Sequence, residues 1–308
     1  MNINIISYVD AFKKGVKGGG EMINEALIKE FKSLKFIDLR YYAVYSNFYH
    51  RFFGAEYSFK NLHSHPDLTI LIDVFNIPSF SNRLNSVFLE NVINNQAYVH
   101  LDNSYVDICS MNFLPCDGQP NCSCCNRLNR VNLYRNSLCN FFLSPMHSDI
   151  VKDLLGCEIK SEVLPPFLDL ENLPTNNQFN KDIEYLYVGT ISKYKGYDEI
   201  YNRFSYLKDS FYFIGPKEKS IKLFSKNYIP WASRVDVYNF MSRSKRFVHL
   251  PSWKEPMGRT VLEASLCGCE IIGNNNVGAL SFDFDISDIN NYKGNLKKGV
   301  ENILKYAY

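Results

Sequence analysis

The feature that most constrains the fold of this chain is a regular alternation of short apolar segments with helical patterns. Several apolar segments are nearly continuous, such as Leu-Thr-Ile-Leu-Ile at 68–72, which is typical of parallel strands covered on both faces. Because strand–helix–strand repeats form βαβ units, the sequence predicts an α/β protein with doubly wound parallel sheets. We expect strands at 2–8, 35–39, 68–75, 96–101, 140–144, 161–164, 183–189, 210–215, 247–251 and 270–273, and helices that include 20–31, 147–155 and 260–267.

A proline-rich and polar stretch at 165–180 interrupts this alternation and is typical of a linker. We therefore expect two Rossmann-like domains, 1–170 and 171–308, that face a cleft at the carboxyl ends of their strands. The first 174 residues carry a net charge of −3 and the rest +5. This balance suits a small anionic ligand on the second domain and is too weak for a nucleic-acid-binding protein.

The N-terminal segment and the hydropathy pattern bear on localisation. Residues 1–10 have no basic region of the kind found in secretory signals, and no apolar run approaches the roughly 18 residues of a spanning helix. We expect a cytoplasmic protein whose nine cysteines are reduced or bind metal.

Two glycine-containing loops follow expected strands. Gly18 and Gly19 precede a helix, where they would let a phosphate or a sugar approach the backbone closely, although a flexible turn has the same composition. Gly189 and Thr190 end another strand, and Lys195 follows in a loop where it could meet a diphosphate; a solvated loop is the alternative.

The most informative segment is Trp-Lys-Glu-Pro-Met-Gly-Arg-Thr at 253–260. The amides of Gly258, Arg259 and Thr260 would lie at a helix start, which favours phosphate. Glu263, one turn later, could accept ribose hydroxyls, and Glu255 could face a sugar ring. Two surface glutamates would be the simpler explanation.

Glu255 and Glu263 are separated by seven residues. This segment resembles the Glu-x7-Glu signature of GT-B glycosyltransferases, specifically family 4 (glycosyl transferases group 1). Other segments are similar to family motifs in the same order: Gly-Gly-x-Glu at 18–21, Val-Gly-Thr-Ile-Ser-Lys-Tyr-Lys-Gly at 188–196, Phe-Ile-Gly at 213–215 and Asn-Val-Gly-Ala at 276–279. The resemblance covers most of the chain and is more specific in its second half.

The resemblance implies a retaining, metal-independent hexosyltransferase that moves a sugar from a UDP-, GDP- or ADP-linked donor. The acceptor would be a glycan or a lipid-linked glycan in polysaccharide or glycoconjugate synthesis. Glu263 would bind the ribose, Glu255 the donor sugar, and Lys195 with the 258–260 amides the diphosphate. His100 resembles a family histidine that touches the donor sugar, although a lone histidine at a strand end is more often structural. No cofactor is implied for catalysis.

One departure from the family pattern motivates an alternative function. Thr190 stands where the family commonly has an arginine, so Lys193 or Arg259 would have to compensate. The alternative is a catalytically weakened subunit that binds a nucleotide sugar or a partner glycosyltransferase. A sugar-nucleotide epimerase would lack the Glu-x7-Glu context, and a phosphorylase would need a cofactor lysine that the sequence does not show.

Five cysteines lie close together at Cys109, Cys116, Cys122, Cys124 and Cys125. They could supply the ligands of a structural zinc ion, although the spacing is not the paired Cys-x-x-Cys form. Free thiols and a disulfide are the alternatives.

Residues 40–53 are unusually aromatic, with Tyr41, Tyr45, Phe48, Tyr49 and Phe52 at helical spacing. We expect a helix there, whose aromatic face packs on the first domain or forms an acceptor or membrane-interface surface. A peripheral membrane contact through 41–53 follows from the second option.

Overall fold

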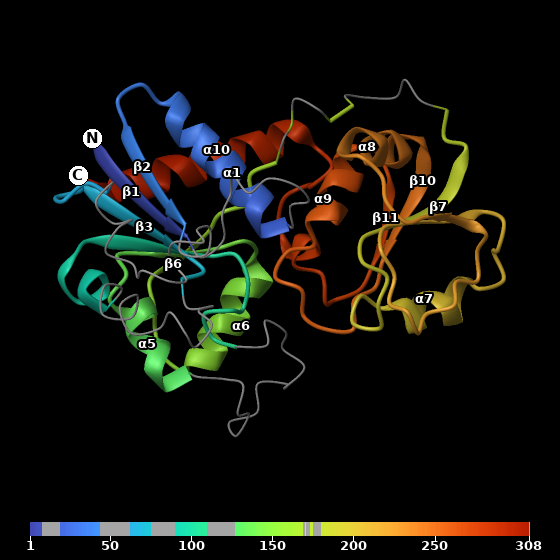
Figure 1. The fold of residues 1–308 in the computed structure, drawn as a ribbon, viewed down its shortest axis with the longest axis horizontal. Coiled ribbons are helices and arrows are strands. Elements are labelled where there is room, and N and C mark those ends of the chain that lie inside the picture. Colours follow the sequence, from blue (N-terminus) through green and yellow to red (C-terminus); the bar gives the residue numbers. More distant parts are fainter. Residues whose placement is uncertain are drawn as a thin grey trace. The chain divides into compact units, whose positions relative to one another are not determined.

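The computed structural model describes residues 1–7, 19–43, 62–74, 90–109, 127–168, 170, 173–174 and 180–307, without the side chains of 127–130. The chain forms two compact units, Met1–Leu168 with Asn295–Tyr308 and Asp169–Gly294 (Figure 1). The division after Leu168 falls close to the expected boundary, but 295–308 were expected in the second domain and instead belong to the first unit.

The first unit contains a parallel sheet in the order β2-β1-β3-β4-β5-β6. β3 and β4 are buried along their whole length, which explains the continuous apolar run at 68–72. The strands are β1 (Asn2–Ser7), β2 (Asp38–Ala43), β3 (Leu68–Ile72), β4 (Tyr98–Asp102), β5 (Asn140–Phe142) and β6 (Ser161–Val163).

Helices cover both faces of this sheet (Figure 1). α1 (Gly19–Ser33) and the end of α10 (Ile289–Leu304) pack their apolar residues onto β1, β3 and β4, with α5 (Arg127–Arg135) and α6 (Pro145–Leu155) on the other face. Val300 and Ile303 of α10 belong to this core, which is why the C-terminal segment joins the first unit. A short helix, η3 (Lys305–Ala307), follows α10.

The second unit contains a parallel sheet in the order β11-β10-β7-β8-β9. α7 packs on one face over an aromatic core that includes Tyr187, Phe211 and Phe213, whereas α8 and α9 cover the other face (Figure 1). The elements are β7 (Ile183–Val188), α7 (Tyr197–Phe204), β8 (Phe211–Ile214), β9 (Asn227–Ile229), α8 (Arg234–Arg243), β10 (Ser244–His249), α9 (Arg259–Leu266), β11 (Glu270–Gly273) and η2 (Gly278–Ser281).

The predicted fold class is confirmed, because both units are α/β with parallel sheets. The expected helix at 40–53 is wrong at its start: Tyr41 lies in β2 and pairs with Ile5 of β1. Tyr45, Phe48, Tyr49 and Phe52 lie outside the described residues, as does most of the proposed membrane-contact segment. In the part of the chain that the structure describes, no helix is long and apolar enough to cross a membrane.

Candidate donor-binding site

Two loops of the second unit meet at the carboxyl ends of β7 and β10. The first carries Lys195 and ends at Gly196, the residue that precedes α7. Gly196 has a φ of +83°, and a Cβ atom there would lie 1.6 Å from the carbonyl oxygen of Leu250, just after β10. The absence of a side chain therefore lets the Lys195 loop lie directly against the chain that leads to Glu255.

Glu255 lies between two basic side chains. Lys195 Nζ forms an ion pair with Oε1 of the Glu255 carboxylate, and His249 Nε2 lies 2.5 Å from Oε2. The Lys195 ammonium also lies 5.5 Å from the centre of the Trp253 ring, which is within cation–π range. The structure thus brings together Lys195 and Glu255, which lie 60 positions apart in the sequence.

The backbone of Glu255 is held by the segment that follows β11. The Glu255 N–H donates to the Asn276 carbonyl over 2.7 Å, and the Gly278 N–H donates to the Glu255 carbonyl over 3.0 Å. An isolated parallel bridge joins Glu255 to Val277. The Asn-Val-Gly-Ala motif at 276–279 therefore supports the position of Glu255.

The environment of Glu255 fixes its charge. Burial by itself would raise the pKa of the carboxyl group, but the charges and hydrogen bonds of His249 and Lys195 outweigh burial and lower the pKa to about 2. Glu255 is therefore an anion at any physiological pH. It can accept hydrogen bonds from hydroxyl groups, and it is not a proton donor.

The start of α9 and Glu263 form the adjacent part of the site. Gly258 caps α9 with a φ of +77°, so the first N–H groups of the helix follow Glu255 closely in the chain. Glu263 is buried within α9, where it accepts a hydrogen bond from the Tyr238 hydroxyl over 3.2 Å. Arg259 Nε lies 3.6 Å and Arg234 3.8 Å from the same carboxylate oxygen.

Two residues beside the Glu263 carboxylate, one basic and one polar, were not anticipated from the sequence. Arg234 and Tyr238 come from α8, one turn apart, and the Arg234 side chain donates to the Tyr238 hydroxyl over 2.9 Å. Their helical spacing could have been read from the sequence, but no motif connects α8 with Glu263. Arg259, one of the two residues suggested to compensate for Thr190, lies beside Glu263. Thr260 is half-buried in the first turn of α9.

Gly189 and Thr190 follow β7 directly. Thr190 is exposed, and its carbonyl oxygen accepts a hydrogen bond from the Tyr187 hydroxyl over 2.9 Å. Its side chain cannot supply the positive charge of the arginine that the family resemblance predicts at this position.

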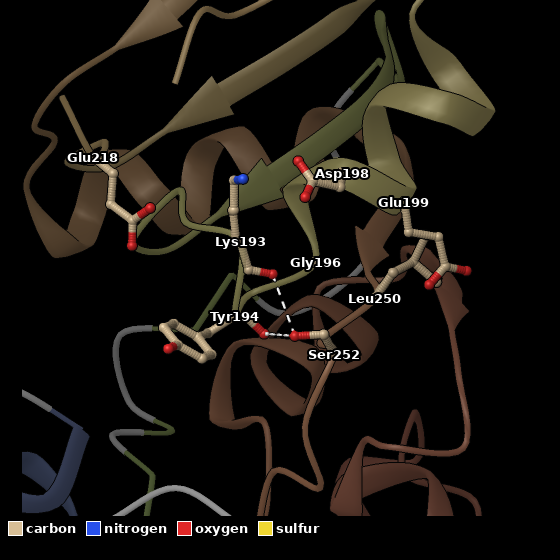
Figure 2. A pocket seen from close by; sticks show the side chains of 8 residues that line it. All are labelled: Lys193, Tyr194, Gly196, Asp198, Glu199, Glu218, Leu250 and Ser252. Carbon is tan, nitrogen blue, oxygen red and sulfur yellow. Dashed lines mark hydrogen bonds between the residues drawn. The ribbon is translucent and has the colours of Figure 1, made fainter. Parts of the chain in front are cut away.

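A pocket of about 510 Å³ lies beside the Lys195 loop (Figure 2). Lys193, Asp198, Glu199 and Glu218 contribute charged side chains to its lining, which also includes Tyr194, Gly196, Leu250 and Ser252. Three carboxylates against one lysine make this pocket unfavourable for a diphosphate. The geometry therefore favours the Glu255 side of the loop for an anionic ligand, and Lys193 belongs to the acidic pocket.

His100 lies far from solvent in the first unit. It is fully buried in the middle of β4 and not at the strand end as expected, because β4 continues to Asp102. Its Nε2 lies 2.9 Å from Asp107 and its Nδ1 3.2 Å from the side-chain oxygen of Asn140. Both ring nitrogens therefore have partners inside the protein, an arrangement typical of a structural histidine. Its predicted contact with the donor sugar stays a prediction.

A second buried histidine belongs to the same region. His147 lies 3.7 Å from Asp102, and neither ring nitrogen makes a hydrogen bond with the described residues. Burial, together with the nearby His100, lowers the pKa of His147 to about 3. Burial also raises the pKa of Asp102 and Asp73, and Asp107 adds to the effect on both.

Several predicted site residues lie at or beyond the edge of the described segments. Gly19 is exposed at the start of α1, and Cys109 is a buried free thiol. Gly18, Cys116, Cys122, Cys124 and Cys125 lie outside the described residues. The described ranges contain no group of three histidine, cysteine or acidic side chains placed to hold a metal ion, and the zinc site stays a prediction.

The geometry of the second unit agrees with a comparison of its sequence. Residues 170–282 match the family model described as Glycosyl transferases group 1. The matched residues make up most of the second unit. Both glutamates and Lys195 lie within the matched residues, so the resemblance seen in the sequence is confirmed at this level. No curated protein sequence matches the chain.

Solved structures of GT-B glycosyltransferases are similar to the whole chain. The Anabaena protein Alr3699/HepE in complex with UDP and glucose has a TM-score of 0.57 at 12% identity, covering 100% of this chain and 92% of its own. Sucrose-phosphate synthase from Thermosynechococcus elongatus has a TM-score of 0.62 at 13% identity, with coverages of 100% and 91%. AviGT4, a glycosyltransferase involved in avilamycin A biosynthesis, has a TM-score of 0.53 at 11% identity, with coverages of 100% and 92%. These likenesses establish the GT-B fold.

Proposed function

We propose that this protein is a glycosyltransferase that transfers a sugar from a nucleotide-diphosphate donor to a glycan or lipid-linked acceptor. The observation that carries the proposal is the Lys195–Glu255 pair at the start of α9, inside the region that matches the family. A cation, helix amides and a permanently ionised carboxylate lie together there. This combination suits a ligand with a negative diphosphate and a hydroxyl-rich sugar.

Each group has a distinct task in the proposed reaction. Lys195 and the first amides of α9 hold the diphosphate and stabilise the charge that develops on it as the glycosidic bond breaks. Glu255 accepts hydrogen bonds from donor-sugar hydroxyls, and Glu263 accepts hydrogen bonds from the ribose. The proposed transfer proceeds with retention and without a metal ion, and the leaving phosphate oxygen takes the proton of the acceptor hydroxyl.

UDP is the first donor nucleotide to test, because the similar HepE structures contain UDP and UDP-glucose. Thermal shift with UDP, GDP, ADP and their common sugars would identify the nucleotide, and product analysis with glycan acceptors would measure transfer. We expect Glu255→Ala and Lys195→Ala to abolish turnover. Lys193→Ala is the matched control, because Lys193 lies on the same loop but in the acidic pocket. Turnover that survives in Glu255→Ala would contradict the proposal.

One observation favours the alternative of a weakened subunit that binds a nucleotide sugar or a partner glycosyltransferase. Thr190 brings no charge to a position where the family commonly has an arginine, and the Lys195 ammonium is already paired with Glu255. Stable binding of a nucleotide sugar by the wild-type protein, without turnover across a panel of glycan acceptors, would support this alternative.

A further inference from the structure

His249 is a buried residue of the second unit that lies outside the motifs considered above. It is the last residue of β10, and its side chain is only 4% exposed. Its Nε2 atom lies 2.5 Å from Oε2 of Glu255, on the carboxylate oxygen that Lys195 does not contact. His249 and Lys195 therefore hold different oxygens of one carboxylate.

The surroundings of His249 leave Glu255 as its polar partner among the described residues. The ring stacks on Tyr187, with centroids 6.2 Å apart, and lies 6.4 Å from the ring of Phe247. Nδ1 is buried without a hydrogen bond to the described part of the chain. Burying a polar ring against aromatic rings costs more free energy than burying an apolar side chain. The contact with Glu255 offsets part of this cost and suggests a role for His249 at the carboxylate.

The two basic partners of Glu255 differ in what else they can bind. The side chain of Lys195 is 27% exposed, and its ammonium has three N–H donors. A bound diphosphate would compete with Glu255 for this ammonium. His249 lies beneath the carboxylate with almost no exposed surface, so it cannot be drawn away by the same ligand.

We propose that His249 is the positioning residue for Glu255, and that it keeps this carboxylate oriented and ionised when a donor diphosphate engages Lys195. The inference rests on the proposed function and deepens it. It assigns the recognition of the donor sugar, as distinct from the nucleotide, to a two-residue unit of His249 and Glu255. His249 itself does not touch the ligand.

Because sugar recognition and diphosphate binding are assigned to different residues, replacing His249 should affect one and not the other. Without the imidazole N–H, a diphosphate that engages Lys195 leaves Glu255 as a buried charge without a compensating partner. The carboxyl group would then take up a proton or turn away from the sugar. Binding of the nucleoside diphosphate alone depends on Lys195 and the α9 amides, so it would be preserved.

The test compares His249→Leu and His249→Gln with wild type, using the nucleoside diphosphate and the matching nucleotide sugar that bind the wild-type protein. His249→Leu should bind the nucleoside diphosphate within about threefold of wild type and lower kcat for the sugar nucleotide by about tenfold or more. His249→Gln retains an N–H donor and should recover most of that loss. Phe247→Leu alters the packing of the same ring without removing the N–H, and it should leave kcat near wild type.

A pH profile separates positioning from mere packing. His249 faces the Glu255 carboxylate and the Tyr187 ring, and Lys195 contacts the same carboxylate. In the leucine variant the Glu255 pKa should rise, so kcat should fall at a higher pH on the acid side than in wild type. The glutamine variant should show a smaller displacement in the same direction, because glutamine keeps an N–H donor to the carboxylate.

Three results would overturn the inference while leaving the proposed function intact. They are wild-type kcat in His249→Leu, equal losses in the leucine and glutamine variants, and a parallel loss of nucleoside-diphosphate binding. A wild-type protein that binds no nucleoside diphosphate would instead contradict the proposed function itself. Melting temperatures of all variants identify any change that comes from unfolding.

Discussion

Close contact between two loops places Lys195 beside Glu255, and single residues control that contact. Gly196 lies where the Lys195 loop touches the backbone after β10, and Gly258 lies where the chain turns into α9. A Cβ atom at Gly258 would lie 2.9 Å from a methyl group of Val277, in the segment that supports Glu255. Both positions need a left-handed backbone in addition to space.

Gly196→Ala should lower the free energy of unfolding by about 3 kcal/mol, because the new methyl group combines backbone strain with a collision against the Leu250 carbonyl. Gly294→Ala is the matched control, since Gly294 lies in α10 with open space around its Cα atom. The control should be neutral or stabilising by up to about 1 kcal/mol. Chemical denaturation of both variants measures the difference, and equal stabilities would contradict the close contact described here.

The residues of the site could be predicted in part. The spacing of the glutamates and the strand context predict Glu255, Glu263 and Lys195 as site residues, and the structure brings Lys195 and Glu255 together. The pairing of Lys195 with Glu255 depends on the contact between two separate loops, so no local pattern indicates it. In the sequence, His249 belongs to a strand that is expected to be buried, and no motif marks it. Its orientation toward Glu255 is seen only in the structure.

The secondary-structure elements were predicted best where a single hydrophobic pattern dominates the sequence. β3 has a nearly continuous apolar run, and it forms within the expected range 68–75. β9 was missed, because Asn-Tyr-Ile is too short to show a period. The aromatic stretch after residue 40 was misread at its start, because pairing with β1 extends β2 to Ala43 and outweighs the helical spacing.

Burial of a neutral histidine near the start of α6 should make the protein sensitive to mild acid. The pKa of His147 falls from 6.5 to about 3 on folding, so the unfolded chain binds a proton that the folded chain excludes. The stability from His147 is fully present above pH 6.5 and decreases as the pH falls below that value. At pH 5 the loss amounts to about 2 kcal/mol.

His147→Leu should therefore reduce the decrease in unfolding free energy between pH 7 and pH 5 by about 2 kcal/mol. The apolar replacement fits a site where His147 packs edge-on against Tyr105 and Phe142. His65→Gln is the control, because His65 is exposed, and it should keep the wild-type dependence. If the leucine variant loses as much stability as wild type over this range, His147 is not the group responsible.

The two units share one continuous chain, and the last segment returns to the first unit. Ile303 is fully buried in the core around β1 and β3, and Lys305 pairs with Glu162 over 2.8 Å. Sequence order alone places 295–308 in the second domain, because the linker signal at 165–180 has no counterpart near residue 294. The packing of residues such as Ile303 against the first sheet assigns 295–308 to the first unit.

Ile303→Ala should destabilise the first unit by about 3 kcal/mol, as expected for a buried isoleucine truncated to alanine. Hydrogen exchange should show lost protection in β1 and β3 and little change in β7 and β10. Glu301→Ala, an exposed position on the same helix, should change stability by no more than about 0.5 kcal/mol. Lost protection mainly in the second unit would contradict the assignment of the C-terminal segment.

The central claim is that the second unit holds a nucleotide-diphosphate sugar through Lys195 and the start of α9. Isothermal titration of UDP and UDP-glucose into wild type, Lys195→Ala and Lys193→Ala tests it most directly. We predict binding by wild type and Lys193→Ala, and an affinity at least about tenfold weaker in Lys195→Ala. Equal affinities in Lys195→Ala and wild type, or a loss confined to Lys193→Ala, would contradict the claim.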